Sequence, residues 1–246
     1  MSKKSRLDQL VVQCGMATSR EQARRLILAG KVSVADVVIT KAGQLVDEAA
    51  IVQLLEPEHG FVGRGGMKLA HALAHFQIAV KNKICLDAGA STGGFTDCLL
   101  QGGARKVYAV DVGYGQLAWA LRNDSRVVVM ERTNLRHVTT SKIPERIEIV
   151  TLDLAFISLT KIFPMLPPLL VPNAIIIALI KPQFEVGKGH VGKGGIVRDD
   201  AARKSAIDQV LAAAASLQWQ HLGVIDSPIT GADGNVEFLA AFSVGL

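Results

Sequence analysis

Residues 83–96 have the sequence KICLDAGASTGGFT, and this stretch decides the fold of the longer part of the chain. Its first five residues form a short, mostly apolar run that predicts a buried strand ending at Asp87. Gly89, Gly93 and Gly94 follow, so we expect a tight turn and then a helix that begins near Gly94. Glycine lets a backbone approach a ligand closely and adopt positive φ at no steric cost. Ligands of open α/β sheets bind beyond the carboxyl ends of the strands, which makes this turn a candidate cofactor site.

Further strand-like apolar runs follow this stretch and alternate with helical stretches, the clearest of which is 199–217. Such alternation favours a mostly parallel sheet covered by helices on both faces. The predicted fold class is therefore α/β, with a Rossmann-like, seven-stranded sheet. The strands are expected at residues 83–87, 107–111, 127–130, 147–153, 174–180, 222–225 and 237–244.

The chain is 246 residues long, enough for one large α/β domain and a small appendage. Hydrophobic residues make up 49% and charged residues 20%, which indicates a folded globular protein rather than a disordered one. Residues 1–41 contain eight lysines or arginines and three acidic residues, so this segment accounts for the whole formal charge of +5. Positive charge concentrated in this way favours a polyanionic partner at the N-terminal end.

The N-terminal segment alternates helical and extended patterns, as a small α+β domain would. Thr18 or Ser19 can cap a helix that stops at Gly30. Arg20 and Arg24 lie one turn apart on this helix, beside an apolar stripe. Short strands and turns are expected after it. The two arginines either contact a polyanion or form a solvated helix face, the usual arrangement at this spacing.

The sequence EPEHG at 56–60 has the composition of a linker, so the chain is expected to divide into residues 1–58 and 59–246. The N-terminus has no apolar stretch long enough for a signal peptide. The cysteines lie far apart without a Cys-x-x-Cys motif or histidine partners, so neither a disulfide framework nor a zinc site is predicted. A reducing, cytoplasmic location is therefore expected. The three cysteines are Cys14, Cys85 and Cys98.

Residues 162–180 carry no charge, and their length is close to that needed to span a bilayer. The same stretch contains four prolines, and each internal proline removes a helix hydrogen bond and clashes with the preceding turn. We therefore expect a helix end, a proline-bounded loop and a buried strand over 174–180, rather than a membrane span.

The glycine-rich turn favours one class of cofactor. A dinucleotide-binding turn has the pattern G-x-G-x-x-G, whereas this one is GASTGG and comes soon after Asp87. S-adenosylmethionine carries an ammonium and a sulfonium, which suit a carboxylate better than a phosphate-binding turn would. Asp111, at the end of the next expected strand, can accept hydrogen bonds from ribose hydroxyls. S-adenosylmethionine is thus preferred over a nicotinamide cofactor. The residues expected to form the cofactor site are Asp87, Gly89, Ser91, Gly93, Phe95, Asp111, Asn134 and Asp153.

Four polar residues stand where they could convert a cofactor site into a reaction site. Lys68 follows the glycine-rich GRGGM at 63–67, Asp153 and Lys181 close two expected strands, and Glu237 opens the last one. Strand-end placement brings Asp153 and Lys181 to the cofactor edge of the sheet. Taken singly, these residues have plain alternatives: a surface charge, a strand-edge carboxylate or a phosphate contact.

The sequence resembles two known families. Its N-terminal part is similar to the S4 RNA-binding domain, and nearly the whole chain resembles the FtsJ-like ribose 2′-O-methyltransferases. The most similar branch is the TlyA type, also labelled hemolysin A, in which an S4 domain precedes the methyltransferase domain. The first resemblance is carried by RLD at 6–8, SREQARRLI at 19–27 and GKV at 30–32. The second is carried by residues 63–68, 87–95, 111–117, 131–134, 153–158 and 181–195.

The resemblance implies an activity and the residues that perform it. It implies S-adenosylmethionine as the cofactor, ribosomal RNA or ribosomal subunits as the partner, and 2′-O-methylation of a cytidine ribose as the reaction. Lys68, Asp153, Lys181 and Glu237 match the catalytic Lys-Asp-Lys-Glu tetrad of the family. S4-like modules place an arginine-bearing helix against RNA. The residues expected to contact RNA are Arg6, Arg20, Arg24, Arg25, Lys31, Arg64, Lys188 and Lys193.

The chemistry explains why two lysines and two carboxylates suit this reaction. A ribose 2′-hydroxyl is a poor nucleophile, so a group must take its proton or steer its oxygen toward the methyl group, and Lys181 is assigned this role. A lysine acts as a base only after losing its own proton, which Lys68 and burial favour and Asp153 and Glu237 oppose. Correct positioning of the reactants alone can lower the reaction barrier by about 7–11 kcal/mol. No metal is required.

Other interpretations fit parts of the sequence. The glycine-rich, basic segment 183–198 could clamp RNA beside the active site or could be a plain connection. The hemolysin label suggests a membrane-acting protein, which the proline-broken apolar run opposes. A third possibility is a non-catalytic, RNA-binding ribosome-assembly factor that uses its cofactor only as a folding ligand. The intact tetrad opposes both of these alternatives.

Overall fold

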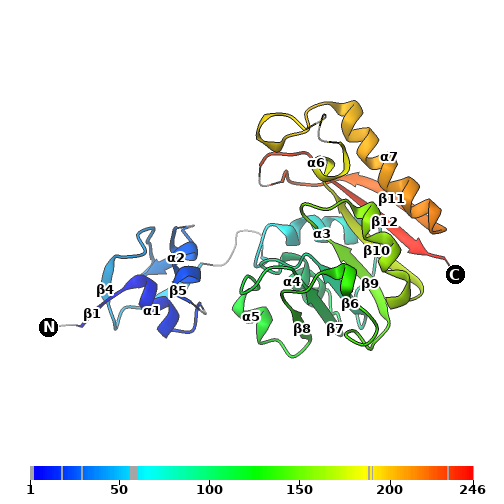
Figure 1. The fold of residues 1–246 in the computed structure, drawn as a ribbon. Helices are drawn as coiled ribbons and strands as arrows, with labels where there is room; N and C mark the ends of the chain where they lie inside the picture. The colour runs from blue at the N-terminus through cyan, green and yellow to red at the C-terminus, as the bar shows by residue number, and fades with distance from the viewer. Residues whose placement is uncertain are drawn as a thin grey trace. The chain divides into compact units, whose positions relative to one another are not determined.

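The computed structural model describes residues 3–17, 19–28, 30–55, 60–187, 189, 191–231 and 233–245. The chain divides into two compact units, Met1–Val62 and Gly63–Leu246 (Figure 1). The sequence places the division between residues 58 and 59, four residues earlier than the boundary of these units. Residues 56–59 of the expected linker lie outside the described residues.

The N-terminal unit is a small α+β fold. Helices α1 and α2 pack against two small sheets, one formed by β1 and β4 and the other ordered β3-β2-β5. Its core is made of aliphatic side chains from both helices and from β2, β4 and β5. The elements are β1 (Lys4–Arg6), α1 (Leu7–Gln13), α2 (Arg20–Leu28), β2 (Val32–Val34), β3 (Val37–Val38), β4 (Leu45–Asp47) and β5 (Val52–Leu54).

Local signals explain helix α2. The Ser19 hydroxyl accepts a hydrogen bond from the Gln22 amide at 3.2 Å, which is the expected capping contact. Gly30 follows the helix with φ of +68°, the left-handed conformation that commonly ends helices. The predicted helix is therefore confirmed. Helix α1 has no side-chain cap, and no comparable capping signal precedes it in the sequence.

The C-terminal unit contains the seven-stranded sheet that the sequence predicts, in the order β11-β12-β10-β9-β6-β7-β8. Strands β8, β7, β6, β9 and β10 are parallel, whereas β12 runs antiparallel to both of its neighbours. The strands are β6 (Ile84–Ala88), β7 (Lys106–Val110), β8 (Val127–Met130), β9 (Ile147–Leu152), β10 (Leu170–Ile180), β11 (Trp219–Asp226) and β12 (Phe238–Val244).

Helices cover both faces of this sheet, as predicted. On β6, Leu86 and Ala88 belong to the large core cluster that includes Val210 and Ala214 of helix α7. The side chain of Asp87 points to the other face, where it meets helix α4. Because side chains alternate along a strand, α4 and α7 lie on opposite faces. The helices are α3 (Gly65–His75), α4 (Gly94–Gln101), α5 (Trp119–Arg122), α6 (Pro182–Glu185) and α7 (Asp200–Ser216).

Two strands are longer than the sequence indicates. Strand β10 begins at Leu170, which pairs with Ile147 before an irregularity, instead of at residue 174. Strand β11 begins at Trp219, which pairs with Val244, instead of at residue 222. Prolines and polar residues gave neither extension a strand-like pattern. Both extensions nevertheless form strands, because pairing with a neighbouring strand outweighs local propensity.

The apolar stretch 162–180 forms two short 3₁₀ turns, Phe163–Met165 and Pro167–Leu169, followed by β10. A proline lies at the start of each turn, where its missing amide proton costs no hydrogen bond. Among the described residues, no helix is both long and apolar enough to cross a membrane.

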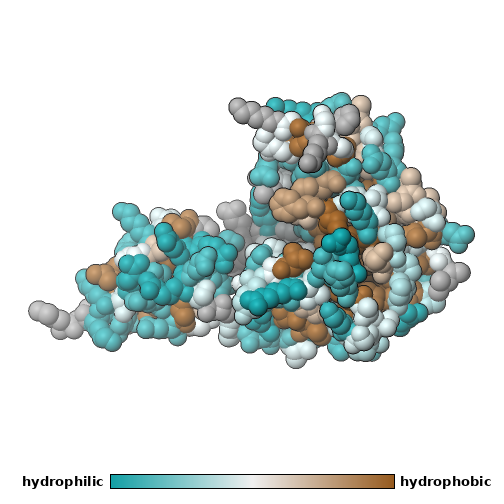
Figure 2. Space-filling model, viewed as in Figure 1, coloured by the Kyte–Doolittle hydropathy of each residue, from teal (hydrophilic) through white to brown (hydrophobic). Residues whose placement is uncertain are grey.

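The visible surfaces of the two units differ in polarity. In Figure 2 the face of the N-terminal unit is mostly hydrophilic, with scattered apolar residues. On the C-terminal unit, apolar residues collect toward the middle of the face and hydrophilic residues surround them. Phe156 of the C-terminal unit is 91% exposed.

Candidate active site

The sheet topology brings three of the four tetrad residues to one edge. Strands β9 and β10 are parallel neighbours, so Asp153 and Lys181, which follow them, leave the sheet at the same edge. Strand β12 runs the other way and pairs Phe238 with Ile180, so Glu237 enters the sheet where Lys181 leaves it. The reversed direction of β12 is therefore what places Glu237 beside the two strand ends.

Helix α3 contributes Lys68, and glycines allow the start of this helix to approach the glycine-rich turn. A Cβ atom on Gly94 would lie 2.9 Å from the Gly66 nitrogen, and one on Gly63 would lie 2.8 Å from the Thr92 hydroxyl. Both distances are too short for a side chain. The GRGG sequence before Lys68 thus fits directly against the turn that follows β6.

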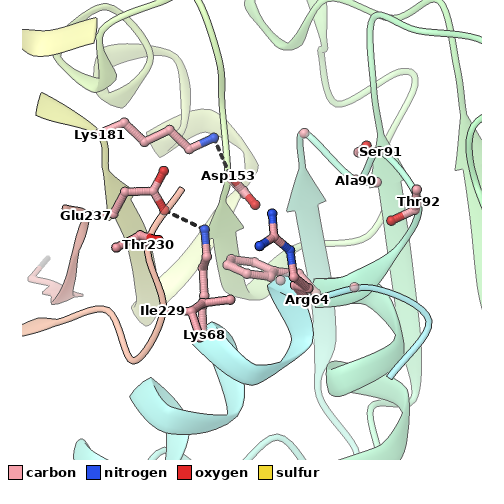
Figure 3. Close-up of a pocket in the computed structure, with 14 residues that line it drawn as sticks. Arg64, Lys68, Ala90, Ser91, Thr92, Asp153, Lys181, Ile229, Thr230 and Glu237 are labelled. Carbon is pink, nitrogen blue, oxygen red and sulfur yellow. Dashed lines mark hydrogen bonds and ion pairs between the residues drawn. The ribbon is translucent and has the colours of Figure 1, made fainter. Parts of the chain in front are cut away.

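The tetrad forms two ion pairs, which Figure 3 shows side by side. The Lys68 amine lies 2.5 Å from a carboxylate oxygen of Glu237, and the Lys181 amine lies 2.6 Å from one of Asp153. The Lys68 and Glu237 side chains are only 10% and 3% exposed, whereas those of Lys181 and Asp153 are 15% and 24% exposed. All four line one hollow, into which the guanidinium of Arg64 also points.

A second hollow adjoins the first. The two share Gly89, Ser91, Asp153 and Lys181 as lining residues. The first is completed by the rest of the tetrad, by Arg64 and by residues of the glycine-rich turn, including Phe95. The second is lined largely by side chains that follow β7, β8 and β9, with apolar and polar groups in similar numbers. They include Asp111, Asn134, Leu135, Leu154 and Ile157.

Two glycines of the turn are fixed by close contacts. Gly89 has φ of +86°, and a Cβ atom there would lie 2.2 Å from the carbonyl oxygen of Asp153. Gly93 has φ of +99°, and its Cβ atom would lie 2.2 Å from a methyl carbon of Leu121. Gly89 lines both hollows, whereas Gly93 lines neither and serves the packing of the turn against helix α5.

Asp111 and Asn134 line the second hollow and also organise its walls. One carboxylate oxygen of Asp111 accepts from the Ser91 amide at 2.8 Å and the other accepts from the Gly113 amide at 2.6 Å. Each carboxylate oxygen has a further lone pair, so Asp111 can still accept hydrogen bonds from a ligand. The side-chain oxygen of Asn134 accepts from the Arg136 amide at 3.0 Å and starts a 3₁₀ turn.

Asp87 lies beneath the turn and lines neither hollow. Its carboxylate is fully buried and accepts hydrogen bonds from the hydroxyls of Thr96 at 2.6 Å and Thr151 at 3.0 Å. Burial raises the pKa of Asp87 to about 7, although both hydroxyls oppose the shift. The sequence suggested that this carboxylate faces a cationic ligand; the structure instead places it as a support between α4 and β9.

Glu185 is a buried acid of this region that the sequence analysis did not identify. Its carboxylate accepts hydrogen bonds from the Ser158 hydroxyl at 2.6 Å and from the Leu159 amide at 3.0 Å. Burial raises the pKa of Glu185, and these two hydrogen bonds lower it. Glu185 lies four residues after Lys181, and Ser158 lies five after Asp153, so the two segments that carry the Lys181–Asp153 pair are joined again here. The only signal for Glu185 in the sequence is that an acid lies about one helical turn after Lys181.

The expected RNA contacts fall into separate groups. In the N-terminal unit, Arg6 and Arg20 both donate hydrogen bonds to Asp8, and these three residues line a surface groove together with Arg24. Arg25 and Lys31 belong to that unit but do not line the groove, and Arg64 lines the tetrad hollow. Lys188 and the side chain of Lys193 lie outside the described residues.

Comparison with known proteins identifies the family. FtsJ-like methyltransferases match residues 61–244, and the S4 domain matches residues 5–52. This chain belongs to the FtsJ-like methyltransferase family. The expected resemblance and the α/β fold with an N-terminal S4 domain are thereby confirmed.

Relatives match nearly the full length of the chain. It is 48% identical to the 16S/23S rRNA (cytidine-2′-O)-methyltransferase TlyA of Mycobacterium tuberculosis, over 97% of this chain and 89% of that protein. It is 42% identical to Hemolysin A of Brachyspira hyodysenteriae, over 97% of this chain and the whole of that protein. A solved structure from Streptococcus thermophilus, provisionally named a hemolysin, is 40% identical with a TM-score of 0.76, covering 100% of this chain and 90% of that one.

Proposed function

We propose that this FtsJ-like methyltransferase transfers a methyl group from S-adenosylmethionine to the 2′-oxygen of a cytidine ribose in ribosomal RNA. The observation that carries the proposal is the convergence of two lysine–carboxylate pairs on one hollow beside the glycine-rich turn. The relative from Mycobacterium tuberculosis is named for this reaction on this class of substrate, which supports the proposal. The partner of the present chain would be ribosomal RNA or a ribosomal subunit, and the chain would act in the cytoplasm.

The residues of the second hollow suit S-adenosylmethionine. Asp111 retains lone pairs for the two ribose hydroxyls, and apolar side chains such as Leu154 and Ile157 would contact the adenine. Gly89 and Ser91 line both hollows and would lie against the methionine part, where a larger residue than glycine would meet the Asp153 carbonyl oxygen. When bound, S-adenosylmethionine supplies a methyl group already activated by its positive sulfur.

The tetrad would hold the ribose hydroxyl for attack. Lys181 lies in the wall shared by both hollows, and its pair with Asp153 fixes the position of its amine. From there the amine would contact the 2′-oxygen and either receive its proton or steer the oxygen by donating a hydrogen bond. The Lys68–Glu237 pair is more deeply buried and would hold the neighbouring wall of the hollow. The reaction forms the carbon–oxygen bond, breaks the carbon–sulfur bond and releases the hydroxyl proton.

The division of labour would follow the two domains, residues 1–58 and 59–246. The S4-like part would hold RNA mainly through its phosphates, which position a substrate without reading its sequence. The FtsJ-like part would carry out the transfer.

Two substitutions at Lys181 test the proposal. Lys181→Ala should lower the single-turnover rate of methyl transfer to ribosomal subunits at least about 100-fold, because a positioned proton-transfer group contributes about 10²–10⁴-fold. Calorimetry should show S-adenosylmethionine binding within about twofold of the unmodified protein. Lys181→Arg separates the two roles, since arginine donates hydrogen bonds but does not accept a proton. Lys142→Ala removes an exposed lysine outside both hollows and is the control. Unchanged transfer by Lys181→Ala would remove Lys181 from the mechanism.

A further inference from the structure

A shallow groove on the N-terminal unit is built around one shared carboxylate. Asp8, in the first turn of α1, accepts two hydrogen bonds from Arg6, at 3.0 and 2.9 Å, and one from Arg20 at 3.1 Å. Arg24 and Glu21 of helix α2 also line the groove. The three arginines therefore outnumber the two acids of the lining, and the groove carries a net positive charge.

The exposure of these side chains is uneven. The Asp8 side chain is 5% exposed, whereas those of Arg6 and Arg20 are 45% and 55% exposed. The acid is thus an internal anchor, and the guanidinium groups extend from it to the surface. Hydrogen bonding from Arg6 is the main cause that lowers the pKa of Asp8 to about 2, so the anchor is ionised at neutral pH.

Both arginines keep donors for a ligand. A guanidinium has five N–H donors, and Asp8 takes two from Arg6 and one from Arg20. Planar guanidinium groups with donors in a fixed fork match the geometry of a phosphate. Two guanidinium groups held by one carboxylate have a net charge of +1, which matches the single negative charge of one phosphodiester.

Gly43 fixes the Arg6 guanidinium from another side. A Cβ atom on Gly43 would lie 3.1 Å from both terminal nitrogens of Arg6 and 3.3 Å from the carbon between them. The guanidinium therefore packs directly on the glycine backbone, in a space that a methyl group would take. This contact is independent of the Asp8 hydrogen bonds, and both hold the same group in one place.

We propose that Asp8 is a positioning residue for RNA binding, which together with Gly43 holds Arg6 and Arg20 as a preformed site for one RNA phosphate. The proposal rests on the proposed function, since it names how the S4-like unit would grip its RNA. A preformed site binds more tightly than a mobile one, because the arginine side chains lose less conformational freedom on binding.

The test uses two substitutions that change the charge equally. Asp8→Asn and Glu48→Gln each remove one negative charge from the N-terminal unit, and Glu48 contacts Ser5 and Lys3 rather than the groove. Charge alone would make both variants bind ribosomal subunits as tightly as the unmodified chain or more tightly. We expect Asp8→Asn to raise the dissociation constant about fivefold or more and Glu48→Gln to leave it unchanged or lower it.

The salt dependence gives a readout that folding defects do not produce. Loss of an ordered phosphate contact should reduce the slope of log affinity against log salt by about one for Asp8→Asn, even though its net charge has risen. Gly43→Ala keeps Asp8 and should weaken binding in the same direction, so it tests the site if Asp8→Asn does not fold. Equal or tighter binding by both Asp8→Asn and Gly43→Ala would overturn the proposal.

A double variant separates the positioning role of Asp8 from RNA binding by the groove as a whole. If the double variant Arg6→Ala/Arg20→Ala binds ribosomal subunits as well as the unmodified chain, the groove has no part in RNA binding. If the double variant binds weakly but Asp8→Asn and Gly43→Ala bind normally, the arginines contact RNA and only the positioning role of Asp8 is wrong.

Discussion

The two charged sites of this protein handle positive charge in opposite ways. In the tetrad hollow each lysine has its own carboxylate, the Lys68–Glu237 pair is almost fully buried, and the four charges cancel. In the groove of the N-terminal unit two arginines share the carboxylate of Asp8, and their guanidinium groups are about half exposed. Matched, buried pairs would hold the proposed reaction geometry, whereas unmatched, exposed cations leave charge for a polyanion.

The energetics of the two arrangements differ accordingly. Burying an ion pair requires removing both charges from water, and the pair is stable only while each partner remains. Exposed pairs contribute little to stability, about 0.2–1 kcal/mol, because water and salt screen them. Substitutions in the tetrad should therefore affect folding as well as catalysis, while substitutions in the groove should affect mainly RNA binding.

The largest effect is expected when the buried pair is broken. Glu237→Ala leaves the Lys68 amine in a buried position without its carboxylate, which should lower the free energy of unfolding by about 3–5 kcal/mol. Denaturant unfolding of the full chain measures this change. Glu48→Gln, which removes the charge of a more exposed acid, should change it far less, because water and salt screen that charge. Equal losses for the two variants would remove the distinction between the sites.

A smaller effect is expected at the second link between the tetrad segments. Glu185→Ala frees the segment after Asp153 from helix α6, so the Lys181–Asp153 pair loses part of its support. Displacement of reacting groups by about 1 Å can cost about 100-fold in rate. We expect Glu185→Ala to lower the single-turnover rate of methyl transfer by about 100-fold. Glu185→Gln should retain most of the rate, because its amide oxygen can still accept a hydrogen bond from the Leu159 amide. A normal rate for Glu185→Ala would limit the role of Glu185 to folding.

Burial of the Asp87 carboxyl group predicts that the stability of the chain depends on pH. Its carboxyl group has a pKa of about 7 in the folded chain, well above the value of 3.8 for a free side chain. A raised pKa of an acid means that its contribution to stability is complete below about pH 4 and is lost as the pH rises through about 7. The unmodified chain should thus lose about 2–3 kcal/mol relative to Asp87→Asn between pH 5 and pH 8. Thermal unfolding at the two pH values measures this, and a constant difference would contradict it.

The smallest effects are expected on helix α2. Arg24 lines the groove and Arg25 does not, although both are exposed and adjacent in sequence. Arg24→Ala should weaken binding of ribosomal subunits about two- to fivefold, the size of a single exposed charge contact, and Arg25→Ala less than twofold. Titration at fixed salt concentration compares the two. A larger loss for Arg25→Ala would move the RNA-binding face away from the groove.

Local patterns were enough to predict much of this molecule. Glycines at 89, 93 and 94, the Ser19 cap and the apolar runs predicted the turn, helix α2 and the central strands, because these features depend on neighbouring residues. Asp153 and Lys181 could be placed at one sheet edge because both end parallel strands.

Features that depend on distant contacts could not be predicted in this way. The partner of Lys68 is 169 residues away, and it arrives there only because β12 reverses direction. The roles of Asp8 and Glu185 likewise follow from which side chains surround them, and the burial of Asp87 from the packing of α4 on β9. Single-sequence patterns carry no record of such pairings.

The position of the transferred methyl group tests the central claim most directly. The full chain is incubated with ribosomal subunits and S-adenosylmethionine labelled in its methyl group, and the RNA is then digested to nucleosides and separated. Two lysine–carboxylate pairs arranged around a ribose hydroxyl predict that the label appears as 2′-O-methylcytidine and is absent when Lys181→Ala replaces the unmodified chain. Label on a base atom, or equal labelling by Lys181→Ala, would contradict the account.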